Sequence, residues 1–175
     1  MFLSLRQLEL GKVHFDQRFS QDQLHLEGEP GIEIPAGIHA VGDAELASVH
    51  TGEIRLRGAL EGTAVSPCDR CLERLEIPLS GPIRVSYEPR ELESSKEEVE
   101  LTENDVEVGY YEGNGLELAD VVREQVLLAL PMQKLCRPDC QGICPTCGAN
   151  RNETACECKP PHVEERWAAL KSLKQ

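Results

Sequence analysis

The sequence predicts an α+β fold with a β-rich N-terminal body, one main helix, a cysteine-rich C-terminal lobe and a short terminal helix. Three observations lead to this prediction. Apolar and polar residues alternate through the first half of the chain, the hydrophobic period changes near residue 114, and six of the eight cysteines fall within residues 135–161. A chain of 175 residues can bury one hydrophobic core and carry a small appendage.

Residues 1–90 form the predicted β-rich body. Apolar residues alternate with polar ones, as strands with one buried face require. The alternating sets are Leu24 and Leu26, Ile54 and Leu56, Leu75 with Ile77 and Leu79, and Ile83 with Val85 and Tyr87. Two strands are therefore predicted near residues 53–65 and 74–88, which places the "CDRC" of 68–71 at a hairpin tip. The proline and glycine residues within 29–37 predict turns.

Residues 91–113 are predicted to be an acidic loop. Within 91–107 there are eight acidic residues and one lysine. Such a charge run favours a solvated or mobile loop. An acidic patch that docks a basic protein is the alternative, and nothing in the local sequence separates the two.

Residues 114–130 are predicted to be the main helix. Asn114 is a suitable N-cap, Glu117 would complete a capping box, and Pro131 would end the helix. One apolar face is made by Ala119, Val122, Val126, Ala129 and Leu130.

The cysteine-rich lobe is predicted over residues 131–160, and a short helix over 161–175 follows it. In that helix Val163, Trp167 and Leu170 share one face, which is typical of a helix that docks through packing.

The charge of the chain is uneven. The net charge of −13 argues against indiscriminate binding to nucleic acid. Residues 131–175, however, carry seven Lys/Arg and five acidic residues, a net +2, which leaves −15 for residues 1–130. The first residues do not resemble a signal peptide, and no apolar run approaches the ~18 residues of a membrane span. We therefore expect a cytoplasmic protein with reduced thiols.

The cysteines occur as four closely spaced pairs, at 68/71, 136/140, 144/147 and 156/158. In a reducing compartment such pairs favour metal binding over disulfides. Zinc accepts four tetrahedral thiolate ligands, so eight cysteines make two complete sites. The "CPTCG" knuckle and the "CEC" pair predict one local site: Cys144, Cys147, Cys156 and Cys158.

The second predicted site uses the remaining cysteines: Cys68, Cys71, Cys136 and Cys140. Its loop of 64 intervening residues costs about 4 kcal/mol of closure entropy. A structural zinc site supplies on the order of 10–16 kcal/mol, so the loop length does not forbid this pairing. The alternative is one zinc ion within residues 136–158, with four thiols left over.

Basic residues lie close to these cysteines in the sequence. They can neutralise the formal −2 charge of a zinc ion with four thiolates, or present cations to RNA phosphates. We expect the first role for Arg70 and Arg74. The candidates for RNA contact are Lys134, Arg137, Arg151 and Lys159.

An enzymatic interpretation is the less favoured alternative. "PCDRC" and the "HLE" of 25–27 match the motifs of zinc deaminases, with His25, Cys68 and Cys71 as ligands and Glu27 as the proton shuttle. Here both motifs lie in β-type sequence, whereas that chemistry places them at helix starts, and six cysteines would have no role. "CDRC" also lacks the βαβ surroundings of a thioredoxin motif. No catalytic residue and no organic cofactor site is predicted.

Residues 64–75, "AVSPCDRCLERL", and 121–170 resemble the YceD family of large ribosomal RNA subunit accumulation proteins. The matching pieces are "CDRCLE", "VLLALP", "LCRPDCQGICPTCGANRNETACEC" and "RWAAL", which together cover a little over a third of the chain. The resemblance implies a non-enzymatic factor for accumulation of 23S ribosomal RNA, in which zinc supports the fold.

The expected function is therefore to assist synthesis, processing or stability of large-subunit ribosomal RNA. The expected partner is that RNA or a ribosomal protein, with no small-molecule substrate and no membrane. The alternative functions are a zinc-ribbon module that docks a protein without touching RNA, and a zinc-dependent hydrolase or deaminase.

Overall fold

The computed structural model describes residues 1–26, 31–90 and 108–158. They form two compact units. The first, called the body here, comprises the described residues of Met1–Ser66 and Glu76–Met132, and the second, the cysteine unit, comprises the described residues of Pro67–Leu75 and Gln133–Gln175. Most of the predicted acidic loop (91–113) and the whole predicted terminal helix (161–175) lie outside the described residues.

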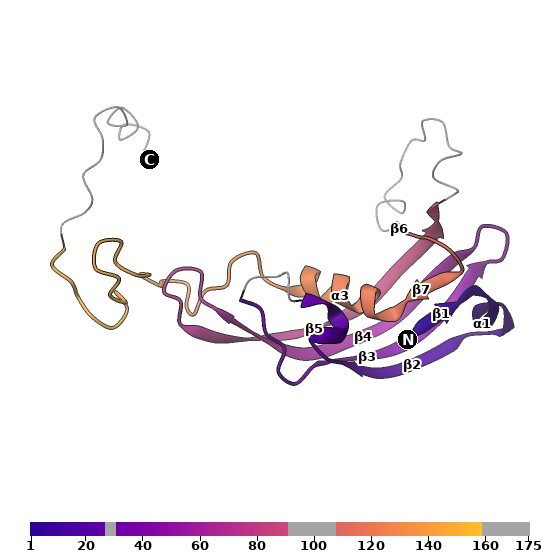
Figure 1. Cartoon of the computed structure of the whole chain (residues 1–175), viewed down its shortest axis with the longest axis horizontal. Coiled ribbons are helices and arrows are strands. Elements are labelled where there is room, and N and C mark those ends of the chain that lie inside the picture. Colours follow the sequence, from indigo (N-terminus) through magenta and orange to yellow (C-terminus); the bar gives the residue numbers. More distant parts are fainter. Residues whose placement is uncertain (27–30, 91–107, 159–175) are drawn as a thin grey trace, which may run out of the picture. The chain divides into compact units, whose positions relative to one another are not determined.

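A five-stranded sheet in the order β2-β3-β4-β5-β6 forms most of the body (Figure 1). Its strands are β2 (Val13–Phe19), β3 (Ile38–Ser48), β4 (Glu53–Pro67), β5 (Arg74–Pro89) and β6 (Val108–Tyr111). β2 and β4 both pair antiparallel with β3. β6 pairs parallel with β5, with Ser86 opposite Val108. A separate two-stranded sheet joins β1 (Phe2–Ser4) to β7 (Gly115–Glu117), with Leu3 opposite Leu116.

The β-rich body is confirmed, and β4 and β5 lie where the alternation of apolar residues predicted strands. The alternation at Leu24 and Leu26 gave the wrong element. Residues Asp22–Leu24 form a short 3-10 helix, η1, and His25 follows it in a left-handed conformation with φ 46°. Both leucines are nevertheless fully buried, because this turn places two alternate side chains in the core without an extended strand.

The main helix, α3, spans Leu118–Ala129 and is shorter than predicted. Asn114 is not its N-cap. That position is held by Glu117, which is extended and makes no side-chain cap. The helix starts later than predicted because residues 115–117 pair with β1 and therefore stay extended. The helix ends before Leu130, whose extended backbone (ψ 136°) is the conformation that a following proline favours.

A second helix, α1 (Leu5–Leu10), was not predicted from the sequence. Ser4 and Gln7 form a capping box at its start, with Ser4 Oγ accepting from the Gln7 N–H. The S-x-x-Q signature was present in the sequence and would have indicated a helix start.

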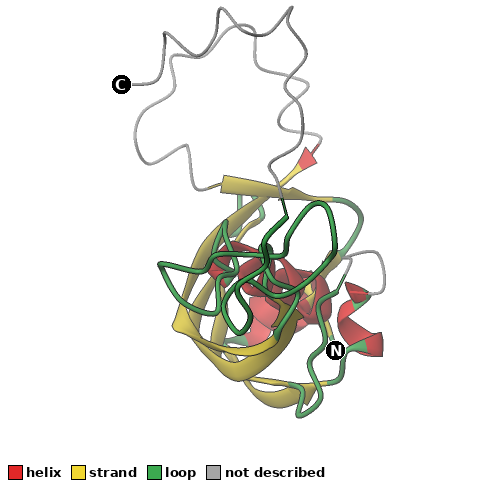
Figure 2. Ribbon diagram, turned by 90° about the vertical axis from the view of Figure 1, so that its left-hand side faces the viewer, coloured by secondary structure: helices red, strands yellow, loops and turns green. Residues whose placement is uncertain are grey.

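The core of the body lies between the sheet and α3. Figures 1 and 2 show α3 against one face of the curved sheet. The helix buries Leu118, Val121, Val122 and Val126. The strands contribute fully buried side chains that include Phe15, Phe19, Ile38, Ile54, Leu56, Leu79 and Ile83.

Gly42 and Gly58 face each other across the β3–β4 ladder. A Cβ atom on Gly58 would lie 2.2 Å from the Val41 carbonyl oxygen, and one on Gly42 would lie 2.8 Å from the Phe15 ring. These contacts are shorter than real Cβ atoms show, so the two strands can approach this closely only because glycine has no side chain.

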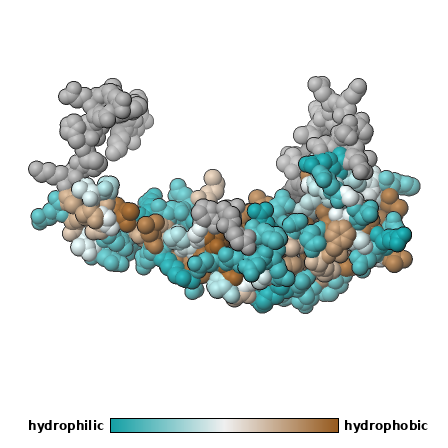
Figure 3. All heavy atoms as spheres, in the orientation of Figure 1, coloured by the Kyte–Doolittle hydropathy of each residue, from teal (hydrophilic) through white to brown (hydrophobic). Residues whose placement is uncertain are grey.

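The surface of the molecule is mostly hydrophilic on the face drawn in Figure 3, where hydrophobic areas are small and separate. Within the described ranges, no helix is both long enough and apolar enough to cross a membrane.

Candidate metal centres

The turn between β4 and β5 carries Cys68 and Cys71, so the structure places "CDRC" at the predicted hairpin tip. The Cys68 N–H donates to the Glu73 carbonyl at 2.8 Å, and the Leu72 N–H donates to the Cys68 carbonyl at 3.0 Å. Leu72 closes the turn with a φ of 64°. This tight turn brings two cysteines that are three positions apart toward the same point.

The segment after α3 is hydrogen-bonded to this turn. The Asp69 N–H donates to the Lys134 carbonyl at 2.7 Å, and the Lys134 N–H donates back to the Asp69 carboxylate at 2.7 Å. Further along, the Ile143 N–H donates to the Arg70 carbonyl at 3.0 Å. Gly142 makes this approach possible, since its φ is +71° and a Cβ there would lie 3.0 Å from that carbonyl. Two distant segments of the chain are thus joined within the cysteine unit.

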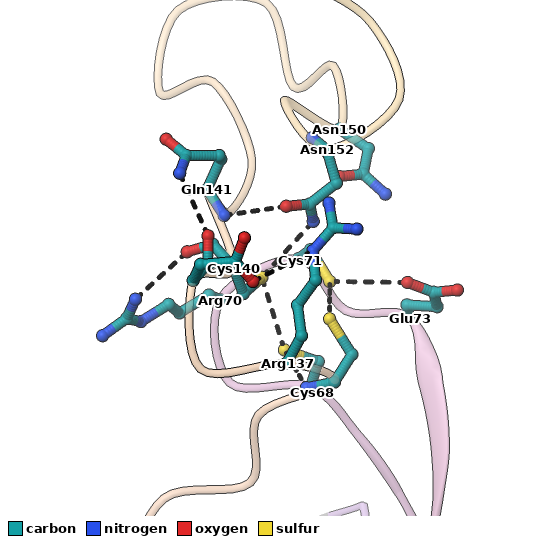
Figure 4. Close-up of polar contacts among 11 residues, drawn as sticks. Cys68, Arg70, Cys71, Glu73, Arg137, Cys140, Gln141, Asn150 and Asn152 are labelled. Carbon is teal, nitrogen blue, oxygen red and sulfur yellow. Dashed lines mark hydrogen bonds and ion pairs between the residues drawn. The ribbon is translucent and has the colours of Figure 1, made fainter.

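Their cysteines form the first cluster: Cys68, Cys71, Cys136 and Cys140. All four Sγ atoms lie within 4.8 Å of one another. The Cys68 and Cys140 sulfurs are 3.9 Å apart (Figure 4). The Cys71 and Cys136 sulfurs are 3.6 Å apart. These distances exceed the ~2.05 Å of a disulfide. Tetrahedral zinc with Zn–S bonds of ~2.3 Å holds its sulfurs about 3.8 Å apart, so this set of donors fits such an ion.

Two N–H groups donate to sulfurs of the first cluster. The Cys136 N–H donates to Cys68 Sγ at 3.4 Å, and Asn152 Nδ2 donates to Cys140 Sγ at 3.3 Å. Burial raises the pKa of Cys68, but the backbone N–H groups around it outweigh burial and lower the pKa to about 6. The Asn152 amide is the main cause that lowers the pKa of Cys140. Both thiols are therefore prepared to become thiolate ligands.

The pKa of Cys136 shifts in the opposite direction. Burial and the neighbouring thiol of Cys71 raise its pKa to about 12. A metal ion that binds all four sulfurs must displace this proton, so metal binding to the first cluster releases protons and strengthens as pH rises.

The second cluster is Cys144, Cys147, Cys156 and Cys158, whose Sγ atoms also lie within 4.8 Å of one another. The Cys144 N–H donates to the Ala149 carbonyl at 2.8 Å, and the Gly148 N–H donates to the Cys144 carbonyl at 2.8 Å. Gly148 has a φ of +75°, which closes the predicted knuckle. Backbone N–H groups of Cys147 and Thr146 lower the pKa of Cys144 to about 6. The Cys147 thiol raises the pKa of Cys158 to about 12.

The candidate RNA-contact residues differ in the exposure of their side chains and in their distance from acidic groups. Lys134 Nζ lies 3.3 Å from Asp69 Oδ1, and only 23% of its side chain is exposed. The Arg137 side chain is 47% exposed, with Nε at 3.7 Å from an Asp139 oxygen. Arg151 is exposed. Lys159 lies outside the described residues.

Arg70, which was expected to neutralise charge, donates from Nη1 to the Cys140 carbonyl at 3.1 Å. Its guanidinium therefore lies beside the backbone carbonyl of Cys140, as Figure 4 shows.

The deaminase motif does not assemble within the described ranges. Cys68 and Cys71 share their group with two further cysteines, and neither metal-capable group found in the described part of the chain contains a histidine. His25 lies in the body at the end of η1. Glu27, the proposed proton shuttle, lies outside the described residues.

Sequence reasoning missed Asn152 and Asp69. Asn152 bonds a sulfur of the first cluster, and Asp69 links the hairpin tip to the segment after α3. Both lie within the cysteine-rich motifs, but neither belongs to a pattern that names its partner.

The family model described as "Large ribosomal RNA subunit accumulation protein YceD" matches residues 56–174. The chain belongs to the YceD family. The matched residues include most of β4, all of β5 and α3, and all eight cysteines. The family name describes a factor for the accumulation of ribosomal RNA and specifies no reaction.

Related chains extend the similarity into the N-terminal strands. Uncharacterized proteins of Mycobacterium tuberculosis and Mycobacterium bovis are each 30% identical over 156 residues, which cover 85% of this chain and 70% of the relative. The chloroplastic YCED homolog 1 of Zea mays, named as a large ribosomal RNA subunit accumulation protein, is 38% identical over 50 residues. Those residues cover 28% of this chain and 17% of the maize protein. No solved structure matches the chain.

Proposed function

We propose that this YceD-family chain is a non-enzymatic cytoplasmic factor that assists synthesis, processing or stability of large-subunit ribosomal RNA. The observation that carries the proposal is the family match over residues 56–174, which includes all eight cysteines, β5 and most of β4. Large-subunit RNA or a ribosomal protein is the proposed partner. The reducing cytoplasm would keep the eight thiols available for metal.

The cysteine unit is proposed to hold two zinc ions, one in each cluster. Four sulfurs per cluster, their mutual distances within 4.8 Å and the absence of histidine from the two described groups support a structural zinc assignment. All eight cysteines would act as metal ligands: Cys68, Cys71, Cys136 and Cys140 in the first cluster, and Cys144, Cys147, Cys156 and Cys158 in the second. Zinc would fix the loops of the cysteine unit and supply no reaction step.

The RNA-binding surface is proposed to lie on the cysteine unit. Residues 131–175 carry a net +2, whereas residues 1–130 carry −15 and would repel phosphate. Arg137 and Arg151 are the strongest candidates, because their side chains are the more exposed ones. Lys134 and Lys159 remain candidates, although the charge of Lys134 is partly compensated by Asp69.

The test compares Arg137→Ala/Arg151→Ala with a control of equal charge change in the body. Arg6 and Arg84 are exposed residues of the body, so Arg6→Ala/Arg84→Ala is the matched control. Protein crosslinked to RNA in growing cells is recovered and the attached RNA is sequenced. We expect large-subunit RNA to be enriched with the wild-type protein and the control, and depleted with the cysteine-unit variant.

Binding to the recovered RNA is then measured at several salt concentrations. Loss of two phosphate contacts should reduce the slope of log affinity against log salt by roughly 0.7–0.9 for each contact. Equal RNA recovery and equal salt slopes for the two double variants would contradict RNA contact through Arg137 and Arg151.

A protein-docking function is the second candidate, and a hollow in the body favours it. The hollow has a volume of about 360 Å³ and lies beside the N-terminal part of α3. Its lining includes all three tyrosines of the chain and four acidic residues: Tyr87, Tyr110, Tyr111, Glu112, Glu117, Asp120 and Glu124. The described residues that line it include no lysine or arginine. Glu112 and Glu117 already pair with Arg90 and the N-terminal ammonium, so Asp120 and the exposed ring of Tyr110 are the groups that suit a basic segment of a ribosomal protein, through an ion pair and a cation–π contact.

The substitution Asp120→Asn/Tyr110→Ala tests this second function. Tyr110 is 44% exposed, so its removal leaves the core intact. Two results together would make docking the mechanism in place of direct RNA contact. Basic ribosomal proteins would co-purify with the wild type but not with this variant, and RNA would be recovered only together with those proteins.

A further inference from the structure

Asn152 connects the two cysteine clusters. It lies between Cys147 and Cys156, within the loop that carries the ligands of the second cluster. Its side chain nevertheless reaches the first cluster, where Nδ2 donates to Cys140 Sγ at 3.3 Å (Figure 4). A residue from one cluster's loop therefore contacts a sulfur of the other cluster.

The orientation of the Asn152 amide follows from its second partner. The Gln141 N–H donates to Asn152 Oδ1 at 2.8 Å, which requires the oxygen to face Gln141. The Nδ2 group is then left to face Cys140, where it can donate to a thiolate. The amide thus holds both the sulfur of Cys140 and the backbone of the next residue.

The second cluster's loop fixes the position of Asn152. The Asn152 N–H donates to Asn150 Oδ1 at 3.0 Å, and the Arg151 N–H donates to the Gly142 carbonyl at 2.9 Å. Ile143 and Asn150 form an antiparallel bridge next to Cys144. A metal ion in the second cluster would hold both ends of this loop, at Cys147 and at Cys156, and so reduce the freedom of Asn152.

We propose that Asn152 couples the two metal sites, so that a metal ion in the second cluster strengthens metal binding by the first. This inference rests on the metal occupancy proposed above. A donor to a ligating sulfur orients the ligand and stabilises its charged form, and such partners typically change metal affinity by about 10–100-fold. By thermodynamic linkage, a metal ion in the first cluster strengthens binding by the second by the same factor.

The test measures zinc binding by the full chain and by four variants of it. Cys144→Ser/Cys147→Ser leaves only the first cluster, and Cys68→Ser/Cys71→Ser leaves only the second. Asn152→Asp keeps the acceptor for the Gln141 N–H but replaces the donor to Cys140 with a negatively charged oxygen, and Asn152→Ala removes both hydrogen-bonding groups without adding a charge. Thr154→Ala, at an exposed position of the same loop, is the matched control.

Zinc affinity is measured by competition with a chromophoric chelator, and circular dichroism verifies that the sheet persists. Asn152→Asp and Asn152→Ala should each weaken the first cluster by about 10–100-fold when the second cluster is intact. Disabling the second cluster should weaken the first by a similar factor. In that background the Asn152 substitutions should have little further effect, since the loop no longer holds residue 152 in place.

Cobalt(II) supplies a readout that a general loss of stability would not change. Without the N–H donor, the sulfur lone pairs of Cys140 rise in energy, so the thiolate-to-cobalt charge-transfer band should move to longer wavelength in Asn152→Asp and Asn152→Ala but not in Thr154→Ala.

Four results would overturn the inference. Unchanged affinity in both Asn152 variants would show that the contact does not support the first cluster. Weakened affinity in those variants, without any effect of disabling the second cluster, would leave Asn152 as a local ligand partner and exclude coupling. A wild-type chain that binds no metal would overturn the metal assignment itself and the coupling with it, whereas two bound ions with independent affinities would overturn the coupling alone.

Discussion

The carboxylate of Asp69 makes two contacts with Lys134. It accepts a hydrogen bond from the Lys134 backbone N–H at 2.7 Å, and it forms an ion pair with the Lys134 ammonium at 3.3 Å. Because Asp69 follows Cys68 and Lys134 precedes Cys136 by two positions, this contact holds the two halves of the first cluster in register. Asp69→Ala should therefore make residues 133–143 more sensitive to protease. Lys134→Met, which keeps the backbone N–H, should have the smaller effect.

The control for this prediction is Asp139→Ala. Asp139 is 81% exposed and reaches Arg137 only at 3.7 Å, so its loss should change little. If Asp69→Ala and Asp139→Ala are cleaved at equal rates, the contact between Asp69 and Lys134 does not hold the two segments together.

Metal content is the second prediction. Protein purified without chelator should contain about two zinc ions for each chain, because each four-sulfur cluster satisfies one tetrahedral ion. Elemental analysis measures the ratio and also reports iron. A ratio near one would contradict the two-cluster assignment. Intramolecular disulfides with no metal in freshly isolated protein would contradict both clusters.

Substitution of one ligand in the first cluster is the third prediction. Cys68→Ser should lower the zinc content toward one ion and open the segment around residues 133–143 to protease, since a site that lacks one ligand loses affinity. Cys147→Ser is the matched variant in the second cluster, and its first cleavage should instead fall within 144–158. Identical cleavage patterns in the two variants would show that the clusters do not hold separate segments.

The fourth prediction concerns Tyr87, whose hydroxyl donates to Glu124 at 2.6 Å. Burial, and then the Glu124 carboxylate, raise the pKa of Tyr87 above its ordinary value. A group with a raised pKa stabilises the fold below the pKa of the unfolded chain, which is ~10 for tyrosine, and loses that contribution as pH rises further. The free energy of unfolding should fall more steeply above pH ~10 in the wild type than in Tyr87→Phe. Parallel curves of stability against pH would refute this role of Tyr87.

The glycine pair of the sheet gives the fifth prediction. Gly58→Ala would place a Cβ atom 2.2 Å from the Val41 carbonyl and force β3 and β4 apart. We expect a loss of about 1–3 kcal/mol in the free energy of unfolding, as for other overpacked sites. Gly81→Ala is the control, since its Cβ would meet nothing within 4 Å. Chemical denaturation compares the two, and equal midpoints would contradict the close approach.

Local patterns in the sequence were sufficient where one strand or one turn decides the structure. The alternation that ends in β4 and begins again in β5 located the hairpin tip, and "CPTCG" located the knuckle around Gly148. Both follow from backbone geometry over a few residues. The grouping of Cys68 and Cys71 with Cys136 and Cys140 also came from the sequence, because four close pairs can form two sets of four in only three ways and the knuckle takes the nearby "CEC" pair.

The remaining features depend on partners distant in the sequence. The start of α3 moved from Asn114 to Leu118 because Gly115–Glu117 pairs with β1, more than a hundred residues away. The strand expected at Leu24 became a turn, since both conformations bury the same two side chains. No pattern of residues along the sequence predicts the hydrogen bond from Asn152 to the sulfur of Cys140.

The sulfurs of the first cluster come from residues made at different times during translation. Cys140 follows Cys68 by 72 residues, which the ribosome adds in roughly 4–14 s at 5–20 residues per second. Until then the nascent β4–β5 hairpin carries two thiols without their partners. The first cluster is complete once Cys140 emerges, four residues before Cys144 begins the second. Synthesis therefore supplies the cysteines of the two clusters in a fixed order, and Cys68 and Cys71 are made before Cys136 and Cys140.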